Sequence, residues 1–197
     1  MTHNSFPMWN AVGVLPPLNE TDPIAAERSP YSVSLSDFVD RFGTSPDRCR
    51  VMDGLLRYRA ALSGAGMIQG FQWFDGSFLE QVEVIESRSP NDIDIVTFFR
   101  LPPGTSLSDV VQRSPDLFPN NRLGQQQLKQ RFFVDPYFVN LDAAGEALVK
   151  QSTYWYSLWS HRRNQTWKGY VEVDLSPGED VAAAAILANL ATPGVQQ

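Results

Sequence analysis

The chain has 197 residues, of which 43% are hydrophobic and 19% are charged, and its formal net charge is −6. This length and apolar content predict a packed globular protein rather than a disordered chain. The acidic balance argues against a protein that holds a long nucleic acid through its overall field. The single cysteine, Cys49, excludes an internal disulfide and a cysteine-based zinc site. No signal segment opens the chain and no apolar run approaches the roughly 20 residues of a membrane span, so we expect a cytoplasmic protein without membrane contact.

The beginning of the chain differs in composition from the rest. Residues 1–30 contain five prolines and little periodicity, which predicts an extended N-terminal segment that wraps over the protein. Residues 31–197 are expected to form a single domain. Within it, a helix is predicted over residues 35–42, which lie between a capping serine and a glycine. A second helix is predicted over residues 46–64, because serine precedes it and proline occupies its first position.

Three strands are predicted in the middle of the chain, over residues 70–75, 92–99 and 132–139. Residues 80–86 alternate Val with Glu, which leaves a helical turn or an extra strand open and favours an extended arm. Pro136 removes a backbone donor from the third strand. That strand must therefore be an edge strand, contain a bulge or end at this residue.

The other predicted elements are shorter or follow the third strand. Pro102-Pro103-Gly104 interrupts the chain, and two short helices are predicted after it, one capped by Ser106 or Ser108 and one through residues 125–130. The last predicted elements are a helix, a strand and a helix, over residues 143–160, 167–175 and 181–190. Together these elements predict an α/β protein with a short mixed sheet and helices on one side.

Two acidic residues share one face of the second predicted strand. Side chains alternate along a strand, so Asp92 and Asp94 project to one side and Ile93 to the other. Two carboxylates on an apolar strand are costly unless a cation lies between them, and a divalent metal that also recruits phosphates is the usual solution. The alternative is a solvated acidic pair at the start of the strand. After the first strand, Gly76 and Ser77 offer backbone N–H groups and a hydroxyl to phosphate oxygens.

A Gly-Ser turn followed by Asp-x-Asp on the next strand resembles the signature of the DNA polymerase β-like nucleotidyltransferase superfamily. The chain is similar to an uncharacterised prokaryotic branch of it, and this resemblance covers most of the sequence. The segments that carry it are Leu15-Pro16-Pro17, Asp75-Gly76-Ser77-Phe78, residues 90–96 (PNDIDIV) and residues 154–169. The resemblance implies the polymerase β-like fold, with a short mixed sheet flanked by helices.

The resemblance also implies roles for particular residues. Asp92 and Asp94 would bind two Mg²⁺ or Mn²⁺ ions, and Asp135 would bind the ion that activates the acceptor hydroxyl. Gly76 and Ser77 would hold the β- and γ-phosphates of an NTP. For Asp135, which precedes a proline, the alternative is an ordinary aspartate at a strand end or turn.

Cations and aromatic residues near these positions are further candidates. Arg131, Arg162 and Lys168 are the expected nucleotide-binding cations, with Lys129 and Arg163 also considered, and solvated surface charge is the alternative for each. The aromatic residues Tyr154, Trp155 and Trp159 are spaced for a helix and would either stack on a base or belong to the core. Asp75 would either bring a further charge to the site or cap the turn. His161 is interpreted as a hydrogen-bonded surface histidine.

The function implied by the resemblance is metal-dependent transfer of a nucleoside monophosphate from an NTP to a hydroxyl of RNA, protein or a small molecule. The alternative is a non-catalytic module on the same fold that binds a nucleotide or a protein partner, and the proline after Asp135 motivates it. A role in a toxin–antitoxin or phage-defence pair is an analogy at the level of the fold.

Overall fold

A computed structural model describes residues 7–19 and 21–191 of the protein, and the rest of the predicted N-terminal segment lies outside these residues. Within this part of the chain, one mixed sheet has the strand order β1-β5-β2-β3-β4. Strand β2 is antiparallel to β3 and β5, whereas β1 is parallel to β5 and β4 is parallel to β3. The strands are β1 (Tyr31–Val33), β2 (Gly70–Asp75), β3 (Ile93–Phe99), β4 (Val134–Asn140) and β5 (Val171–Asp174).

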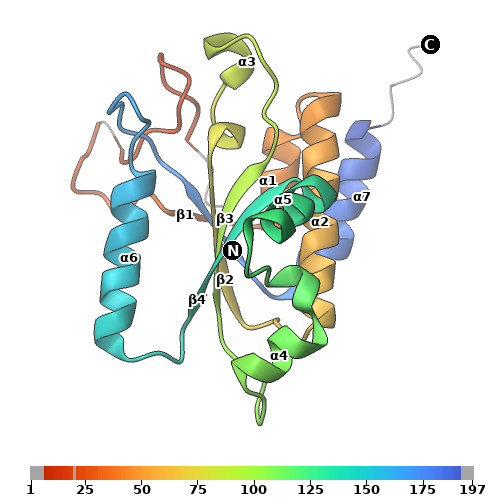
Figure 1. Ribbon diagram of the computed structural model, residues 1–197. Helices are drawn as coiled ribbons and strands as arrows, with labels where there is room; N and C mark the ends of the chain where they lie inside the picture. The colour runs from red at the N-terminus through yellow and green to blue at the C-terminus, as the bar shows by residue number, and fades with distance from the viewer. Residues whose placement is uncertain (1–6, 20, 192–197) are drawn as a thin grey trace.

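Helices cover both faces of this sheet (Figure 1). The longer ones are α1 (Leu35–Phe42), α2 (Pro46–Gly64), α5 (Arg122–Phe132), α6 (Gly145–Trp159) and α7 (Asp180–Ala191). The shorter ones are α3 (Val82–Ile85), α4 (Leu107–Arg113) and the 3₁₀ turns Ser77–Leu79, Pro115–Leu117 and Pro177–Glu179. Helices α1, α2, α5 and α7 lie on one side and α6 lies on the other. The prediction of helices on one side alone is therefore wrong, and the α/β class with a mixed sheet is confirmed.

Local capping signals explain where several helices begin. The Ser34 hydroxyl accepts a hydrogen bond from the Asp37 backbone N–H at 2.9 Å, and Ser45 caps α2 in the same way. Ser106, rather than Ser108, caps α4, where Asp109 completes a capping box. The predicted helices over residues 35–42 and 46–64 are confirmed.

The segment 80–86 is not the extended arm that its Val/Glu alternation favours. A strand would place Val82 and Val84 on one face, but Val82 is buried and Val84 is 74% exposed. The buried Arg48 guanidinium explains the turn, because it donates to the Phe78 and Glu80 carbonyls at 2.6 Å each and pairs with Glu83. These contacts hold the chain in the short helix α3.

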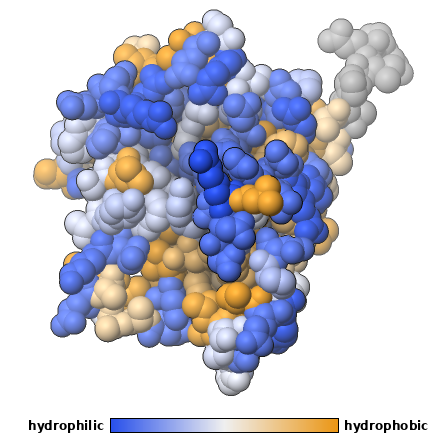
Figure 2. Space-filling model, viewed as in Figure 1, coloured by the Kyte–Doolittle hydropathy of each residue, from blue (hydrophilic) through white to orange (hydrophobic). Residues whose placement is uncertain are grey.

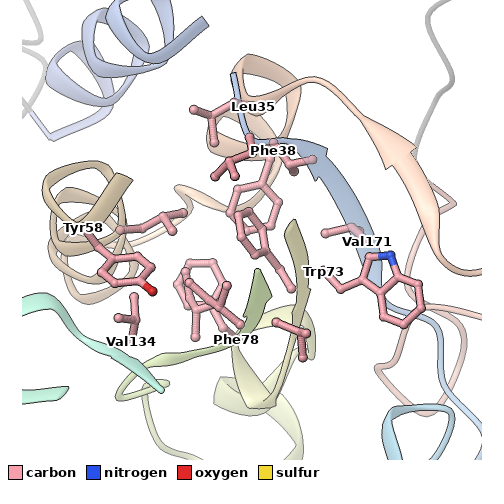
Figure 3. Close-up of a cluster of buried hydrophobic side chains, with 14 of the residues drawn as sticks. Leu35, Phe38, Tyr58, Trp73, Phe78, Val134 and Val171 are labelled. Carbon is pink, nitrogen blue, oxygen red and sulfur yellow. The ribbon is translucent and has the colours of Figure 1, made fainter. Parts of the chain in front are cut away.

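The sheet divides the hydrophobic core into two parts, one on each face. On the face toward α1 and α2, the Phe38 ring lies 5.0 Å from Phe74 and 6.0 Å from Phe78. Figure 3 shows Phe38, Phe78 and Tyr58 gathered on this side, with Trp73 apart from them. Trp73 contacts Tyr170 at 5.3 Å on the face toward α6. The alternation along β2 therefore directs the next odd-numbered residue, Asp75, toward α6 as well.

Strand β4 is an edge strand of the sheet, which confirms one of the three expectations raised by Pro136. The N-terminal segment approaches the 3₁₀ turn Ser77–Leu79, where the Trp9 indole N–H donates to the Leu79 carbonyl at 2.7 Å. Polar residues cover much of the molecular face seen in Figure 2, and hydrophobic residues show between them in smaller patches. Among the described helices, none has the length and apolar character needed to cross a bilayer.

Candidate functional site

Three aspartates form a row across neighbouring strands. The register pairs Asp75 of β2 with Asp94 of β3, and pairs Asp94 with Asp135 of β4. Residues opposite one another on adjacent strands project to the same face, so the three carboxylates lie side by side on the face toward α6. Asp92 directly precedes β3 and, two residues before Asp94, projects to the same side. The structure therefore brings together the three predicted metal ligands and adds Asp75 to them. We call Asp75, Asp94 and Asp135 the carboxylate row.

Asp94 occupies the centre of the carboxylate row. Burial, together with the nearby charges of Asp75, Asp92 and Asp135, raises the pKa of Asp94 to about 7. Within the described residues, Asp94 has no ion-pair partner. The middle of the row is thus the point at which a bound cation would relieve the most repulsion.

A lysine stands at each end of the row. The Lys129 ammonium, from α5, contacts Asp92 and lies 3.2 Å from Asp135 Oδ2. At the other end, the buried Lys168 ammonium lies 2.8 Å from Asp75 Oδ1 and 3.3 Å from Glu80 Oε1. The Lys129 side chain is 44% exposed, so it can leave its carboxylates for solvent more easily than Lys168 can.

The Gly-Ser turn (Gly76 and Ser77) lies directly against Asp94. Gly76 has a φ of +89°, a backbone conformation that favours glycine. A Cβ atom at this position would lie only 2.2 Å from Asp94 Oδ2. Glycine therefore allows the turn to approach the central carboxylate, and Ser77 then begins the 3₁₀ turn.

Two of the predicted nucleotide-binding cations reach this region and both already pair with carboxylates. Arg162 Nε lies 3.0 Å from Glu80 Oε2, and its guanidinium also contacts Glu86. Lys168 shares Glu80 with Arg162. Glu80 thus ties the loop between α6 and β5 to the Gly-Ser turn.

These residues border a cleft of about 760 Å³. It is referred to simply as the cleft. Its floor contains the Gly-Ser turn with Asp75 and Asp94, and α6 supplies aromatic residues along one side. Its polar and charged lining away from the floor consists of Glu80, Glu86, Arg88, His161, Arg162, Arg163, Asn164 and Lys168. Volumes of this size are typical of sites for small molecules.

Arg131 does not reach the cleft. Its side chain is 60% exposed, and Nη1 lies 3.7 Å from Asp116 Oδ2. Two residues along a helix turn the side-chain direction by roughly 200°. Since Lys129 points at the carboxylates, Arg131 points away from them. The candidates Trp155 and Trp159 are buried, whereas Tyr154 is 58% exposed beside the cleft.

Three parts of this site depend on the fold rather than on the sequence. For Asp75 the sequence leaves a turn cap and a further charge at the site open, and the register with Asp94 supports the second. For Lys129 it leaves a phosphate ligand and a solvated surface charge open, whereas the packing of α5 places its ammonium between two aspartates. Glu80 carries no signal in the sequence, because its role depends on the fold of the loop opposite it.

The donor chemistry of the site fits a hard divalent cation, because carboxylate oxygens are the ligands that Mg²⁺ and Mn²⁺ prefer. Asp92, Asp94 and Asp135 are the residues that could hold it. Within the described part of the chain, however, no group of three or more His, Cys, Asp or Glu side chains is arranged to hold a metal ion as it stands. Lys129 lies between two of these aspartates, so metal binding would require its ammonium to move.

Comparison with known proteins gives a family but no described activity. No curated protein matches the sequence, and no solved structure matches it either. A family model described as a family of unknown function, DUF6932, matches residues 7–174. This match includes the carboxylate row, both lysines and the Gly-Ser turn. The chain therefore belongs to the DUF6932 family of unknown function.

Proposed function

We propose that the protein is a metal-dependent nucleotidyltransferase that transfers a nucleoside monophosphate from an NTP to a hydroxyl acceptor. The observation that carries this proposal is the register of Asp94 with Asp135 on adjacent parallel strands, directly beside the Gly-Ser turn. Metal-ligating carboxylates next to a phosphate-binding turn are the two components that such a transfer needs. The polymerase β-like fold implied by the sequence is part of the same proposal.

Each component has a distinct task in this proposal. Asp92, Asp94 and Asp135 would hold Mg²⁺ or Mn²⁺, which when bound neutralises charge on the transferred phosphoryl group and activates the acceptor hydroxyl. Because Gly76 has no Cβ atom, the central carboxylate can lie against the phosphate-binding turn. Lys129 keeps two of the aspartates neutralised until metal binds. The acceptor is the hydroxyl of an RNA, a protein or a small molecule.

A second candidate function is supported by the position of Lys129. Its ammonium contacts Asp92 and Asp135 and already supplies positive charge at the place where catalysis would require a metal. This arrangement favours a non-catalytic module that binds a nucleotide or a protein partner. Toxin–antitoxin and phage-defence pairs are the systems in which such a module would act.

Calorimetric titration of each NTP, with and without Mg²⁺ or Mn²⁺, tests the binding site. The wild type is expected to bind NTP only with metal, and Asp92→Asn/Asp94→Asn is expected to lose this binding. Asp116→Asn is the matched control, because Asp116 is an 82% exposed aspartate paired only loosely with Arg131. Absence of metal-dependent NTP binding by folded wild-type protein would overturn the proposal.

Labelling with NTP that carries a radioactive α-phosphate separates the enzyme from the binding module. In a cell extract, the enzyme should label an acceptor, and Asp135→Asn should abolish labelling while NTP still binds. A wild type that binds NTP with metal but labels no RNA, protein or small molecule supports the binding module instead.

A further inference from the structure

Three of the four aromatic residues that line the cleft contact one another along one side of it, and two of these three are exposed. We call Tyr137, Tyr154 and Trp155 the aromatic wall. The Trp155 ring centroid lies 4.7 Å from that of Tyr137 and 5.0 Å from that of Tyr154. Trp155 is only 6% exposed, whereas Tyr137 is 43% exposed and Tyr154 is 58% exposed. The buried indole thus supports two tyrosine rings that are open to the cleft.

Core packing explains Trp155 but does not explain Tyr154. The Tyr154 ring meets Trp155 edge-on, at 81° between the ring planes. Such a contact leaves ring surface of Tyr154 uncovered, and exposed aromatic surface in a cleft is typical of a ligand site. Because Tyr137 is on β4 and Tyr154 is on α6, the sheet and the helix both fix this wall.

The charges around the cleft indicate what kind of ligand would use the wall. Arg88 lies 2.7 Å from Glu86, and Arg162 and Lys168 pair with Glu80. Arg163 also lines the cleft and is exposed, and within the described residues it forms no ion pair. A ligand with a flat apolar end and an anionic end would therefore match the wall and this free guanidinium together.

We infer that the aromatic wall is the surface on which the base of the NTP stacks, with Tyr154 as the principal contact. This inference rests on the proposed function and names how the same cleft recognises its substrate. The wall offers ring faces rather than a fixed set of donors and acceptors for one base. Every base has a π-face, so the cleft should accept all four NTPs with modest differences in affinity.

Titration of ATP and of inorganic tripolyphosphate, each with Mg²⁺, tests the inference, because only ATP carries a base. Tyr154→Ala should weaken ATP binding by about 5- to 100-fold and leave tripolyphosphate binding unchanged. Tyr154→Phe should bind ATP like the wild type, and Tyr137→Ala should change ATP affinity in the same direction as Tyr154→Ala. Tyr156→Ala is the matched control, since Tyr156 is 44% exposed on the same helix but does not line the cleft.

The outcomes separate this inference from the proposed function. If the wild type binds ATP with metal and Tyr154→Ala binds it equally well, the base does not stack here and the proposed function stands. If Tyr154→Ala weakens ATP and tripolyphosphate alike, its effect is structural and the inference is also overturned. If the folded wild type binds no ATP, both the inference and the proposed function are overturned.

Discussion

Gly76→Ala tests how strongly the Gly-Ser turn constrains Asp94. Gly76 has φ +89° and ψ −173°, a region that is nearly restricted to glycine, and holding alanine there costs about 1–3 kcal/mol of stability. The added methyl would meet Asp94 Oδ2 at 2.2 Å. Because the aspartate side chain is short, it can rotate away, so the clash moves the carboxylate rather than adding much further strain.

Gly104→Ala is the matched control for this substitution. Gly104 also has a positive φ, +72°, but an added Cβ would meet no atom within 4 Å. Urea unfolding should show both variants to be less stable than the wild type. Only Gly76→Ala should also weaken metal-dependent NTP binding, by about 10- to 100-fold, because a displaced carboxylate loses charged contacts worth about 1.5–3 kcal/mol.

Two results would refute this reasoning. Equal NTP affinity of Gly76→Ala and Gly104→Ala would show that the turn does not fix the position of the Asp94 carboxylate. Unchanged stability of Gly76→Ala in urea would show that its backbone relaxes without cost. The first result would also remove the support that the Gly-Ser turn gives to the proposed site.

Three further substitutions or probes test other parts of the structure. Lys168→Met leaves the buried Asp75 carboxylate without its ammonium, whereas Glu80 keeps Arg162, and it should cost about 3–5 kcal/mol in urea unfolding, so a loss below about 1 kcal/mol would contradict the buried pairing. Although burial raises the pKa of Glu83, hydrogen bonds and the charge of Arg48 lower it below its ordinary value. The stabilisation by this ion pair is therefore present above about pH 4.5 and lost as the pH falls through the folded pKa, so Glu83→Gln should flatten the stability profile below that pH. Burial raises the pKa of the Cys49 thiol, so a thiol reagent should react slowly until urea unfolds the protein, and fast reaction with folded protein would contradict this burial.

Local signals predicted most elements of the fold. Ser34 and Ser45 mark helix starts because a cap satisfies backbone donors within three residues, which the sequence shows directly. The segment 80–86 was predicted wrongly because a distant residue, Arg48, decides its conformation. Likewise, the position of α6 on the second face of the sheet depends on aromatic packing that no single segment encodes.

Some features of the candidate site also follow from local sequence, and others depend on the assembled fold. Strand geometry places Asp92 and Asp94 on the same face, and the Gly-Ser turn lies beside Asp94 in the structure. The alignment of Asp135 with Asp94 depends on the parallel register of β3 and β4, which is set only when the sheet forms. Lys129 was distinguishable from Arg131 only by the rotation of α5 against the sheet.

The carboxylate row also affects how variants of this protein should be interpreted. Its residues and the two lysines are spread from position 75 to position 168, so the contacts of Asp94 with Asp135 and of Asp75 with Lys168 each close a long stretch of chain. A fragment that ends at residue 133 would retain Asp92 and Asp94 but lack Asp135, the aromatic wall and Lys168. A substitution far from the cleft that loosens β4 would therefore lower activity in the same way as a substitution of a site residue. Screens for function in this family should measure folding alongside activity.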